Sequence, residues 1–138
     1  MTHTIRAVKK SDALQINEVS QHIGYSQLSD DEAYEKLDFL INPSQNRVHI
    51  AEVDGRIVGW IHIFYAPKLA SESFYEIAGL VVAPEYRNEG VGRSLVDYVL
   101  RLFNAKFRVR CNENRIDARQ FYESIGFKNN KIQYIFDR

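Results

Sequence analysis

The sequence has a single cysteine, Cys111, so the chain cannot form a disulfide with itself. A lone thiol fits a reducing compartment. The chain also lacks any apolar run close to the ~20 residues that a membrane-spanning helix requires. Its first ten residues, MTHTIRAVKK, lack the apolar stretch of a secretory signal. We therefore expect a soluble cytoplasmic protein with no membrane partner.

The chain also has no net charge. Eighteen Lys and Arg balance eighteen Asp and Glu, and the pI is about 6.9. Because nucleic acids and anionic membranes attract proteins through a basic field, we expect no nucleic-acid partner, and any anion site must be local. The four histidines lack the spacing of a metal site, so no metal is expected. Among them, His62 is in the strand expected beside the fourth strand and could approach a substrate.

The length and composition of the chain predict one globular domain over residues 1–138. An Asp54-Gly55 pair between two β-rich runs predicts a hairpin, and Ser29 with Glu32 predicts a capping box. Ser11 is the expected cap of the first helix. Strands are predicted over 4–8, 47–53, 56–65, 74–82, 106–111 and 131–136, and helices after Ser11, after Ser29, over 90–103 and over 115–125. This order predicts a mixed α/β sheet covered by helices.

The stretch 80–95, LVVAPEYRNEGVGRSL, places two glycines between a strand and a helix. Glycines let backbone approach a ligand closely, and a helix N-terminus offers unpaired N–H groups to phosphate. The P-loop and dinucleotide patterns do not fit: Lys-Ser/Thr is absent, and Leu95 stands where a third glycine or alanine belongs. Glu89 argues mildly against an anion. From these residues alone, a phosphate site and a plain tight turn remain equally open.

Two linked stretches resemble the GNAT family of N-acetyltransferases. RNEGVG (87–92) matches the family's acetyl-CoA motif, Arg/Gln-x-x-Gly-x-Gly/Ala, and IAGLVVAP (77–84) resembles the strand before it. NRIDARQFYESIGF (114–127) resembles the second cofactor motif, Asn-x-x-x-Ala-x-x-Phe-Tyr-x-x-x-Gly-Phe. The resemblance covers residues 74–127. It implies a GNAT fold: a mixed, mostly antiparallel sheet of six to seven strands with four helices, its fourth and fifth strands splayed.

The resemblance also implies acetyl-CoA as co-substrate. Its pyrophosphate site carries over to Arg87, Asn88, Glu89, Gly90, Val91 and Gly92, with Arg93 and Ser94 opening the helix. The pantetheine arm is expected to pair like an extra strand with Leu80, Val81 and Val82, whose side chains can still pack in a core. Asn114 is expected to hydrogen-bond this arm, or to cap the helix that begins near Arg115.

Two residues are candidates for the chemistry. Tyr122 matches the family tyrosine that acts as general acid toward the thiolate; its periodicity alone indicates a core residue. Glu76 is the candidate base, since an acid in an apolar strand is costly to bury without a partner and burial makes it more basic. It could equally be a solvated acid at a strand end. Cys111 as an acetyl acceptor is weaker than Cys111 as a small core residue. The acceptor pocket is expected beside Tyr25, Ser26 and Tyr34, unless these only pack.

The resulting functional prediction is an N-acetyltransferase that moves the acetyl group of acetyl-CoA to a primary amine of a small molecule by direct attack in a ternary complex. Two alternatives remain: a protein or peptide acceptor, and a non-catalytic acyl-CoA-binding sensor. The motifs bind the donor and leave the acceptor undetermined, whereas Tyr122 favours an enzyme over a sensor. A homodimer is common in the family, although no residue of the sequence points to one.

Overall fold

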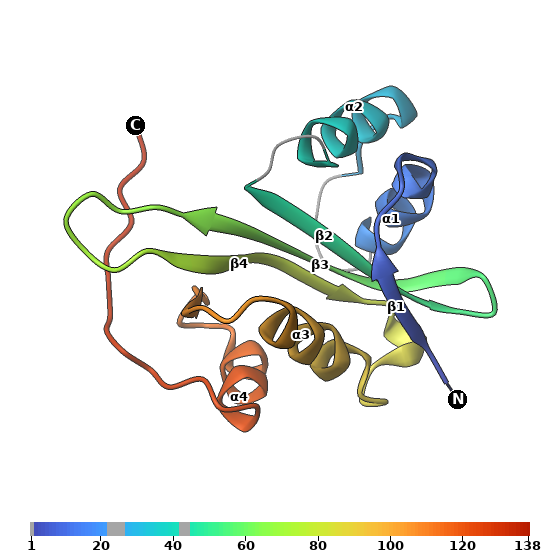
Figure 1. The fold of residues 1–138 in the computed structure, drawn as a ribbon. Coiled ribbons are helices and arrows are strands. Elements are labelled where there is room, and N and C mark those ends of the chain that lie inside the picture. The colour runs from blue at the N-terminus through green and yellow to red at the C-terminus, as the bar shows by residue number, and fades with distance from the viewer. Residues whose placement is uncertain (1, 22–26, 42–44) are drawn as a thin grey trace.

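A sheet with helices on both faces makes up the molecule (Figure 1). The computed structural model describes residues 2–21, 27–41 and 45–138. In chain order the elements are β1 (Thr4–Ala7), the 3-10 helix η1 (Lys10–Asp12), α1 (Ala13–Ser20), α2 (Asp30–Ile41), β2 (Asn46–Val53), β3 (Arg56–Ala66), β4 (Phe74–Val82), the 3-10 helix η3 (Pro84–Tyr86), α3 (Val91–Leu102), β5 (Phe107–Val109) and α4 (Ile116–Ser124). Helices α1 and α2 cover one face, and α3 and α4 the other (Figure 1).

The strands follow the order β1-β2-β3-β4-β5, antiparallel except for the parallel pair β4–β5. The mixed, mostly antiparallel sheet is therefore confirmed. The prediction of six to seven strands is not: the described residues form five. The strand expected over 131–136 is unpaired and has no regular secondary structure. Its alternating pattern is that of a strand, but a strand also requires a neighbour to accept its backbone hydrogen bonds, and the pattern cannot supply that neighbour.

Local signals placed two connections correctly. Asp54 and Gly55 have φ of 50° and 79°, the left-handed pair that closes the β2–β3 hairpin. At the start of α2, the Ser29 N–H donates to Glu32 Oε1 at 3.1 Å and the Glu32 N–H donates to Ser29 Oγ at 3.2 Å. The predicted capping box is therefore confirmed.

Ser11 is not the cap of the first helix, because the chain enters α1 through η1. The neighbouring Asp12 carboxylate accepts two hydrogen bonds from Arg6, at 2.8 and 3.0 Å, and one from the Lys9 N–H at 2.7 Å. Burial alone would raise the pKa of Asp12, but these donors hold it below its ordinary value. This ion pair joins residues six positions apart and fixes the helix entry, and the pattern of helix-capping residues at Ser11 does not predict it.

The main core lies between the sheet and the layer of α3 and α4. Its buried members are Ala51, Val53, Val58, Ile61, Ile63, Ile77, Val91, Leu95, Val96, Val99 and Tyr122. On α3, Val91, Leu95 and Val99 are buried, while Leu102, at the end of the helix, is about half exposed. Smaller clusters join α1 to α2 and join α1 to β4. β4 is therefore held in place by β3 and β5 within the sheet and by apolar contacts on both of its faces.

Candidate active site

Strand β4 has a free edge along half its length. Three residue pairs join it to β5, the last being Ile77 with Val109, whereas β4 continues to Val82 with β3 as its described neighbour. The expected parting of the fourth and fifth strands is therefore present in the register. Backbone groups on an open strand edge can pair with an extended ligand, as a peptide does in strand addition.

A bulge at the start of this free edge changes which side chains face which layer. Against β3, His62 pairs with Gly79 but Ile63 pairs with Ile77, so Ala78 is the extra residue. The side chains of Leu80 and Val82 contact the main core, and Val81 is buried against Val19 of α1. The three predicted pantetheine residues thus pack through side chains and leave the strand edge to their backbone.

The glycine turn leads from β4 into α3. Gly90 has φ of 83°, a backbone conformation that favours glycine. A Cβ built there would meet no atom within 4 Å, so glycine is needed for its conformation and the space beside it is open. The first hydrogen bond of α3 joins Ser94 N–H to Gly90 O at 2.9 Å. The helix ladder therefore does not use the amides of residues 91–93, including Val91, which suits an anion.

Gly92 serves packing as well. A Cβ there would lie 3.4 Å from the Phe121 ring and 3.6 Å from Val82 Cγ2. The small residue lets the start of α3 approach both α4 and the end of β4. The interpretation as a tight turn is therefore supported at Gly92, whereas Gly90 forms an open helix entrance at which phosphate binding stays a prediction.

The charged side chains at the turn are all exposed. The Arg87 side chain bends back so that its Nε donates to Val82 O at 3.4 Å, which places a cation between the end of β4 and the turn. Arg93 Nε lies 3.8 Å from Asp97 Oδ2, one helical turn on. Asn88, with φ of 63°, contributes a backbone kink. Glu89 points into solvent, where its charge interferes little with an anion.

Tyr122 lies on α4 within the main core, so the periodicity predicted its burial correctly. Its ring meets Phe121 edge-on at 5.0 Å and Phe127 at 5.6 Å between centroids. The second cofactor motif thus forms one packed aromatic group beside Gly92. Asn114 is exposed before α4 and does not cap it: the N-cap is Arg115, with no side-chain cap bond, and Asn112 Oδ1 accepts the Asn114 N–H at 2.9 Å.

Glu76 is largely buried, with 15% of its side chain exposed, and so it is not a solvated strand end. Since Tyr75 and Ile77 contact the main core, the alternation of β4 turns Glu76 to the opposite face of the sheet, which is the face that carries α1 and α2. Arg110 Nε donates to Glu76 Oε1 at 3.0 Å, and Arg110 Nη1 donates to Gln133 at 3.2 Å. The ion pair offsets the cost of burying the acid.

The sequence analysis did not identify Arg110. The signal was the alternation of KFRVRC: it sets Arg108 and Arg110 on one face of β5, and the parallel register brings Arg108 opposite Glu76. The alternation predicts an arginine partner for Glu76 only once β5 is known to lie beside β4.

His62 shares the face of Glu76, because its neighbours Ile61 and Ile63 belong to the main core. Its Nε2 lies 2.8 Å from Asn46 Oδ1, and burial lowers the pKa of its imidazole. At neutral pH this histidine is therefore uncharged and hydrogen-bonded. Its approach to a substrate stays a prediction.

The remaining candidates separate clearly. Cys111 is exposed and is not a core residue. Partial burial of its thiol raises its pKa, and the charges of Arg115 and Arg119 offset only part of this increase. Less thiolate is therefore present to act as a nucleophile. Tyr34 packs beside the cluster joining α1 to α2. Tyr25 and Ser26 lie outside the described residues.

Other features of the described chain lie apart from this site. A cavity of about 350 Å³ is lined by residues of β1, β2 and the ends of α2 and α3, among them His49, and by none from β4, the glycine turn or α4. Within residues 2–21, 27–41 and 45–138, no group of three or more His, Cys, Asp or Glu could hold a metal ion. None of the described helices is long and apolar enough to cross a membrane.

Several solved structures similar to this one are described as acetyltransferases. An aminoglycoside antibiotic 6′-N-acetyltransferase from Acinetobacter baumannii superposes with a TM-score of 0.87, at 14% identity, over 99% of this chain and 98% of that one. An aminoglycoside N-acetyltransferase in complex with CoA gives 0.88, at 15% identity, over 99% and 95%. A putative acetyltransferase from Agrobacterium tumefaciens gives 0.87, at 21% identity, over 98% and 99%. At these identities the likeness establishes the fold.

Sequence comparison provides the evidence for a family relationship. An uncharacterised N-acetyltransferase from Archaeoglobus fulgidus is 31% identical over 97 residues, which are 62% of this chain and 63% of that protein. The model of the acetyltransferase (GNAT) family matches residues 13–127, a span that includes α1, the free edge of β4, the glycine turn and α4. The chain therefore belongs to the GNAT acetyltransferase family.

Proposed function

We propose that the protein is an acetyl-CoA-dependent N-acetyltransferase that acetylates a primary amine of a small molecule by direct attack in a ternary complex. The observation that carries the proposal is the continuity of two backbone sites: the free edge of β4 beyond Ile77 leads to the open N-terminus of α3 at Gly90. An extended arm ending in phosphates fits this path, because the first part can form strand-like pairs and the second can take helix amides.

For the cofactor, the backbone of Leu80, Val81 and Val82 would hold the pantetheine arm. The pyrophosphate would rest on the amides from Asn88 to Gly92, with Arg87, Arg93 and Ser94 adding side-chain donors at its rim. Asn114 is free of a capping role and would hydrogen-bond the arm from the α4 side. Bound acetyl-CoA would supply the thioester carbonyl to be attacked.

For the chemistry, the two candidate side chains approach from different faces of the sheet. Glu76 lies on the face of the sheet that carries α1 and α2, and the Tyr122 ring lies in the layer of α3 and α4. The parting of β4 from β5 is the route between these faces. Glu76 would accept the proton of the amine while the new N–C bond forms, and the Tyr122 hydroxyl would donate its proton to the sulfur as the C–S bond breaks.

The small-molecule acceptor is supported by the names of the structural neighbours, which describe acetylation of aminoglycosides. The test is a panel of amines with acetyl-CoA, read by release of the CoA thiol. Polyamino sugars, diamines, amino acids and peptides with free N-termini form its arms. Turnover of a small amine supports the proposal; turnover confined to peptides replaces the acceptor class.

A second measurement separates enzyme from sensor. Acetyl-CoA is expected to raise the melting temperature, because a ligand that binds the folded state stabilises it by mass action. A rise without turnover on any amine would make the protein a sensor. The absence of any rise at millimolar acetyl-CoA would overturn the cofactor assignment itself.

A further inference from the structure

A cavity at the edge of the sheet, where β1 ends, lies apart from the proposed path of acetyl-CoA. The last pair of β1 joins Ala7 to His49, whereas β2 begins earlier, at Asn46. After β1 the chain makes one more bond to β2, from the Val8 N–H to Val48 O at 3.1 Å. Before that point β2 has no described strand on this side, and the cavity of about 350 Å³ lies there, between the ends of α2 and α3.

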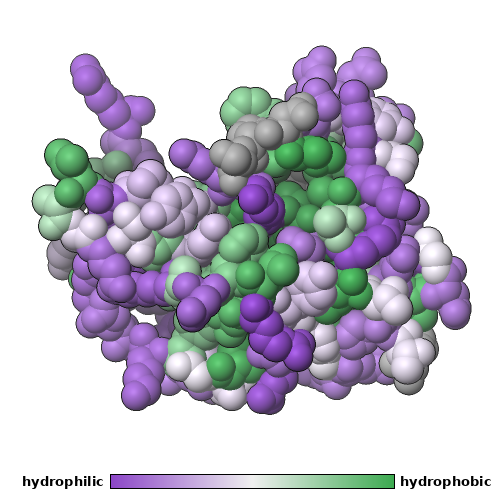
Figure 2. Space-filling model, in the orientation of Figure 1, coloured by the Kyte–Doolittle hydropathy of each residue, from purple (hydrophilic) through white to green (hydrophobic). Residues whose placement is uncertain are grey.

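Most of the cavity's described lining is apolar. These residues come from the end of β1, from β2 and from the last turns of α2 and α3: Ala7, Val8, Leu40, Ile41, Val48 and Leu102. Figure 2 shows apolar surface exposed in the middle of this face, between the two helix layers. The volume lies at the lower end of the range for small-molecule sites, about 300–1,000 Å³. The cavity therefore suits a small ligand with an apolar body.

The polar groups of the lining are mainly hydrogen-bond donors. Arg47 Nη1 donates to Asn46 O at 3.0 Å, and the guanidinium carbon lies 5.8 Å from the centroid of the Phe103 ring, at the end of α3. Asn46 Oδ1 accepts from His62 Nε2 at 2.8 Å, which leaves the amide N–H groups as the donors of this side chain. With His49, the described polar lining holds one positive charge and no acid.

His49 is the buried polar residue of this lining. Its side chain packs against the Tyr98 ring of α3 at 5.1 Å, and the residue is only 4% exposed. Its Nδ1 is buried and has no hydrogen-bond partner among the described residues. An unpaired buried nitrogen costs free energy, which a ligand that supplies the partner recovers. A carboxylate suits both groups, because its oxygens accept from an imidazole N–H and its charge is opposite to that of Arg47.

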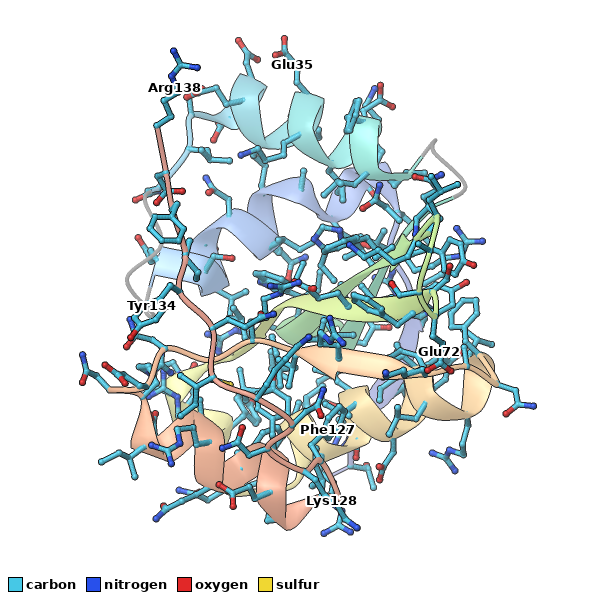
Figure 3. All side chains as sticks on the ribbon, turned by 90° about the vertical axis from the view of Figure 1, so that its left-hand side faces the viewer. Glu35, Glu72, Phe127, Lys128, Tyr134 and Arg138 are labelled. Carbon is cyan, nitrogen blue, oxygen red and sulfur yellow. The ribbon has the colours of Figure 1, made fainter. Side chains whose placement is uncertain are left out.

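The acids of α2 leave this charge in place. Glu35 projects outward from α2, away from the sheet (Figure 3). Asp38, two residues before Leu40, has its Oδ1 3.7 Å from Lys10 Nζ. The two acids nearest to the cavity along this helix are therefore directed to solvent and to a lysine, and an incoming anion meets a positive group.

We propose that this cavity binds a small carboxylic acid with a short apolar chain. Arg47 and the His49 imidazole hold the carboxylate, and the chain lies on Val8, Leu40 and Leu102. The proposal does not depend on acetyl transfer, and its test uses no acetyl-CoA.

The experiment titrates the ¹⁵N-labelled unmodified protein with hexanoate and follows its amide signals by NMR. Hexanoate is expected to shift the signals of residues 46–49 in a saturable way at millimolar concentration. Hexanamide has the same chain without the charge and is expected to bind about ten-fold more weakly, because hydrogen bonds to an ionised group are the stronger ones. Equal binding of the two probes would overturn the carboxylate, and the lack of any saturable shift would overturn the site.

A pair of variants tests the assigned cation. Arg47→Gln is expected to weaken hexanoate binding about ten-fold, since it removes the charge and keeps a polar side chain. The control is Arg56→Gln on β3, where an exposed arginine pairs with Glu85, and its affinity should equal that of the unmodified protein. Equal affinities of the two variants would overturn the proposal. If Arg47→Gln does not fold, the comparison of hexanoate with hexanamide on the unmodified protein still decides.

Two further outcomes would assign the anion elsewhere. Shifts at residues 88–92 in place of residues 46–49 would put hexanoate at the glycine turn and overturn the proposal. A tripeptide that ends in a leucine carboxylate provides the last arm. Tighter binding of this peptide than of hexanoate at residues 46–49 would make the ligand a chain terminus and overturn the small acid.

Discussion

At the scale of single residues, the ring and the hydroxyl of Tyr122 have separable roles. Phenylalanine at this position keeps the contacts with Phe121 and Phe127 and removes only the O–H. We expect Tyr122→Phe to lower kcat about 100-fold, the range of a general acid, with acetyl-CoA affinity nearly unchanged. Steady-state kinetics and calorimetric titration of acetyl-CoA give the two numbers.

The control is Tyr98→Phe on α3, where the ring faces His49 at 5.1 Å and lies outside the proposed site. Its kcat should match that of the unmodified enzyme. If Tyr122→Phe turns over as fast as this control, Tyr122 serves packing alone.

Glu76 raises the complementary question, since its ion pair with Arg110 is also a structural role. We expect Glu76→Gln to lower kcat/KM about 100-fold and to change its dependence on pH, because the amide cannot take a proton. Rates measured from acid to mildly alkaline pH report both effects.

Two comparisons decide between base and structural partner. Glu72→Gln removes an exposed acid paired with Lys106 and should leave the pH profile intact. Arg110→Gln breaks the same ion pair and keeps the carboxylate. If Arg110→Gln and Glu76→Gln give equal losses and one unchanged pH profile, the base is water or another residue.

At the scale of elements, prediction succeeded where a signal is local and failed where a partner is distant. The Asp54-Gly55 hairpin and the capping box of Ser29 each depend on residues within four positions, and both are confirmed. The entry to α1 depends on the ion pair between Arg6 and Asp12, and a strand over 131–136 would need a neighbouring strand that the described residues do not supply. Neither requirement follows from the local pattern of helix caps and alternating residues, so the cap and the last strand were predicted wrongly.

The site divides in the same way. The family motif predicted the glycine turn and the parting of β4 from β5, and both are present in the backbone. The Glu76–Arg110 ion pair could be predicted only from the register between β4 and β5. The bulge at Ala78 decides which face each side chain takes beyond it. Alternation alone cannot locate a bulge, since one extra residue reverses every later assignment.

The turn before α3 can be tested against an equivalent turn elsewhere. Gly90 and Gly55 both have positive φ, 83° and 79°, and both face open space where a Cβ would lie. Alanine should cost about 1–2 kcal/mol of stability at either position, because L-residues resist this conformation. Only Gly90→Ala should weaken acetyl-CoA binding, as measured by titration.

The pairing of the two variants makes the result interpretable. Equal destabilisation with selective loss of binding assigns the entrance of α3 to the cofactor. A Gly90→Ala protein that binds acetyl-CoA as tightly as Gly55→Ala would show that the glycine shapes the turn only.

At the scale of the whole molecule, stability comes from the apolar core and not from charge. Basic and acidic residues are equal in number, and the ion pairs Lys10–Asp38, Arg56–Glu85 and Arg93–Asp97 join side chains that are mostly exposed. Exposed pairs contribute little, about 0–1 kcal/mol each. The titration of buried groups should therefore dominate the dependence of stability on pH.

The buried His49 and the partly buried His62 set that dependence near neutral pH. Burial lowers the pKa of His49, assisted by the Arg47 charge, and burial lowers that of His62. As the pH falls through their ordinary value of 6.5, the unfolded chain binds protons that the folded chain resists. The free energy of unfolding must therefore decrease from about pH 7.5 to about pH 5.5. Urea unfolding across this range measures the slope. His49→Gln should reduce the slope; a slope that His49→Gln does not alter would assign it to other groups.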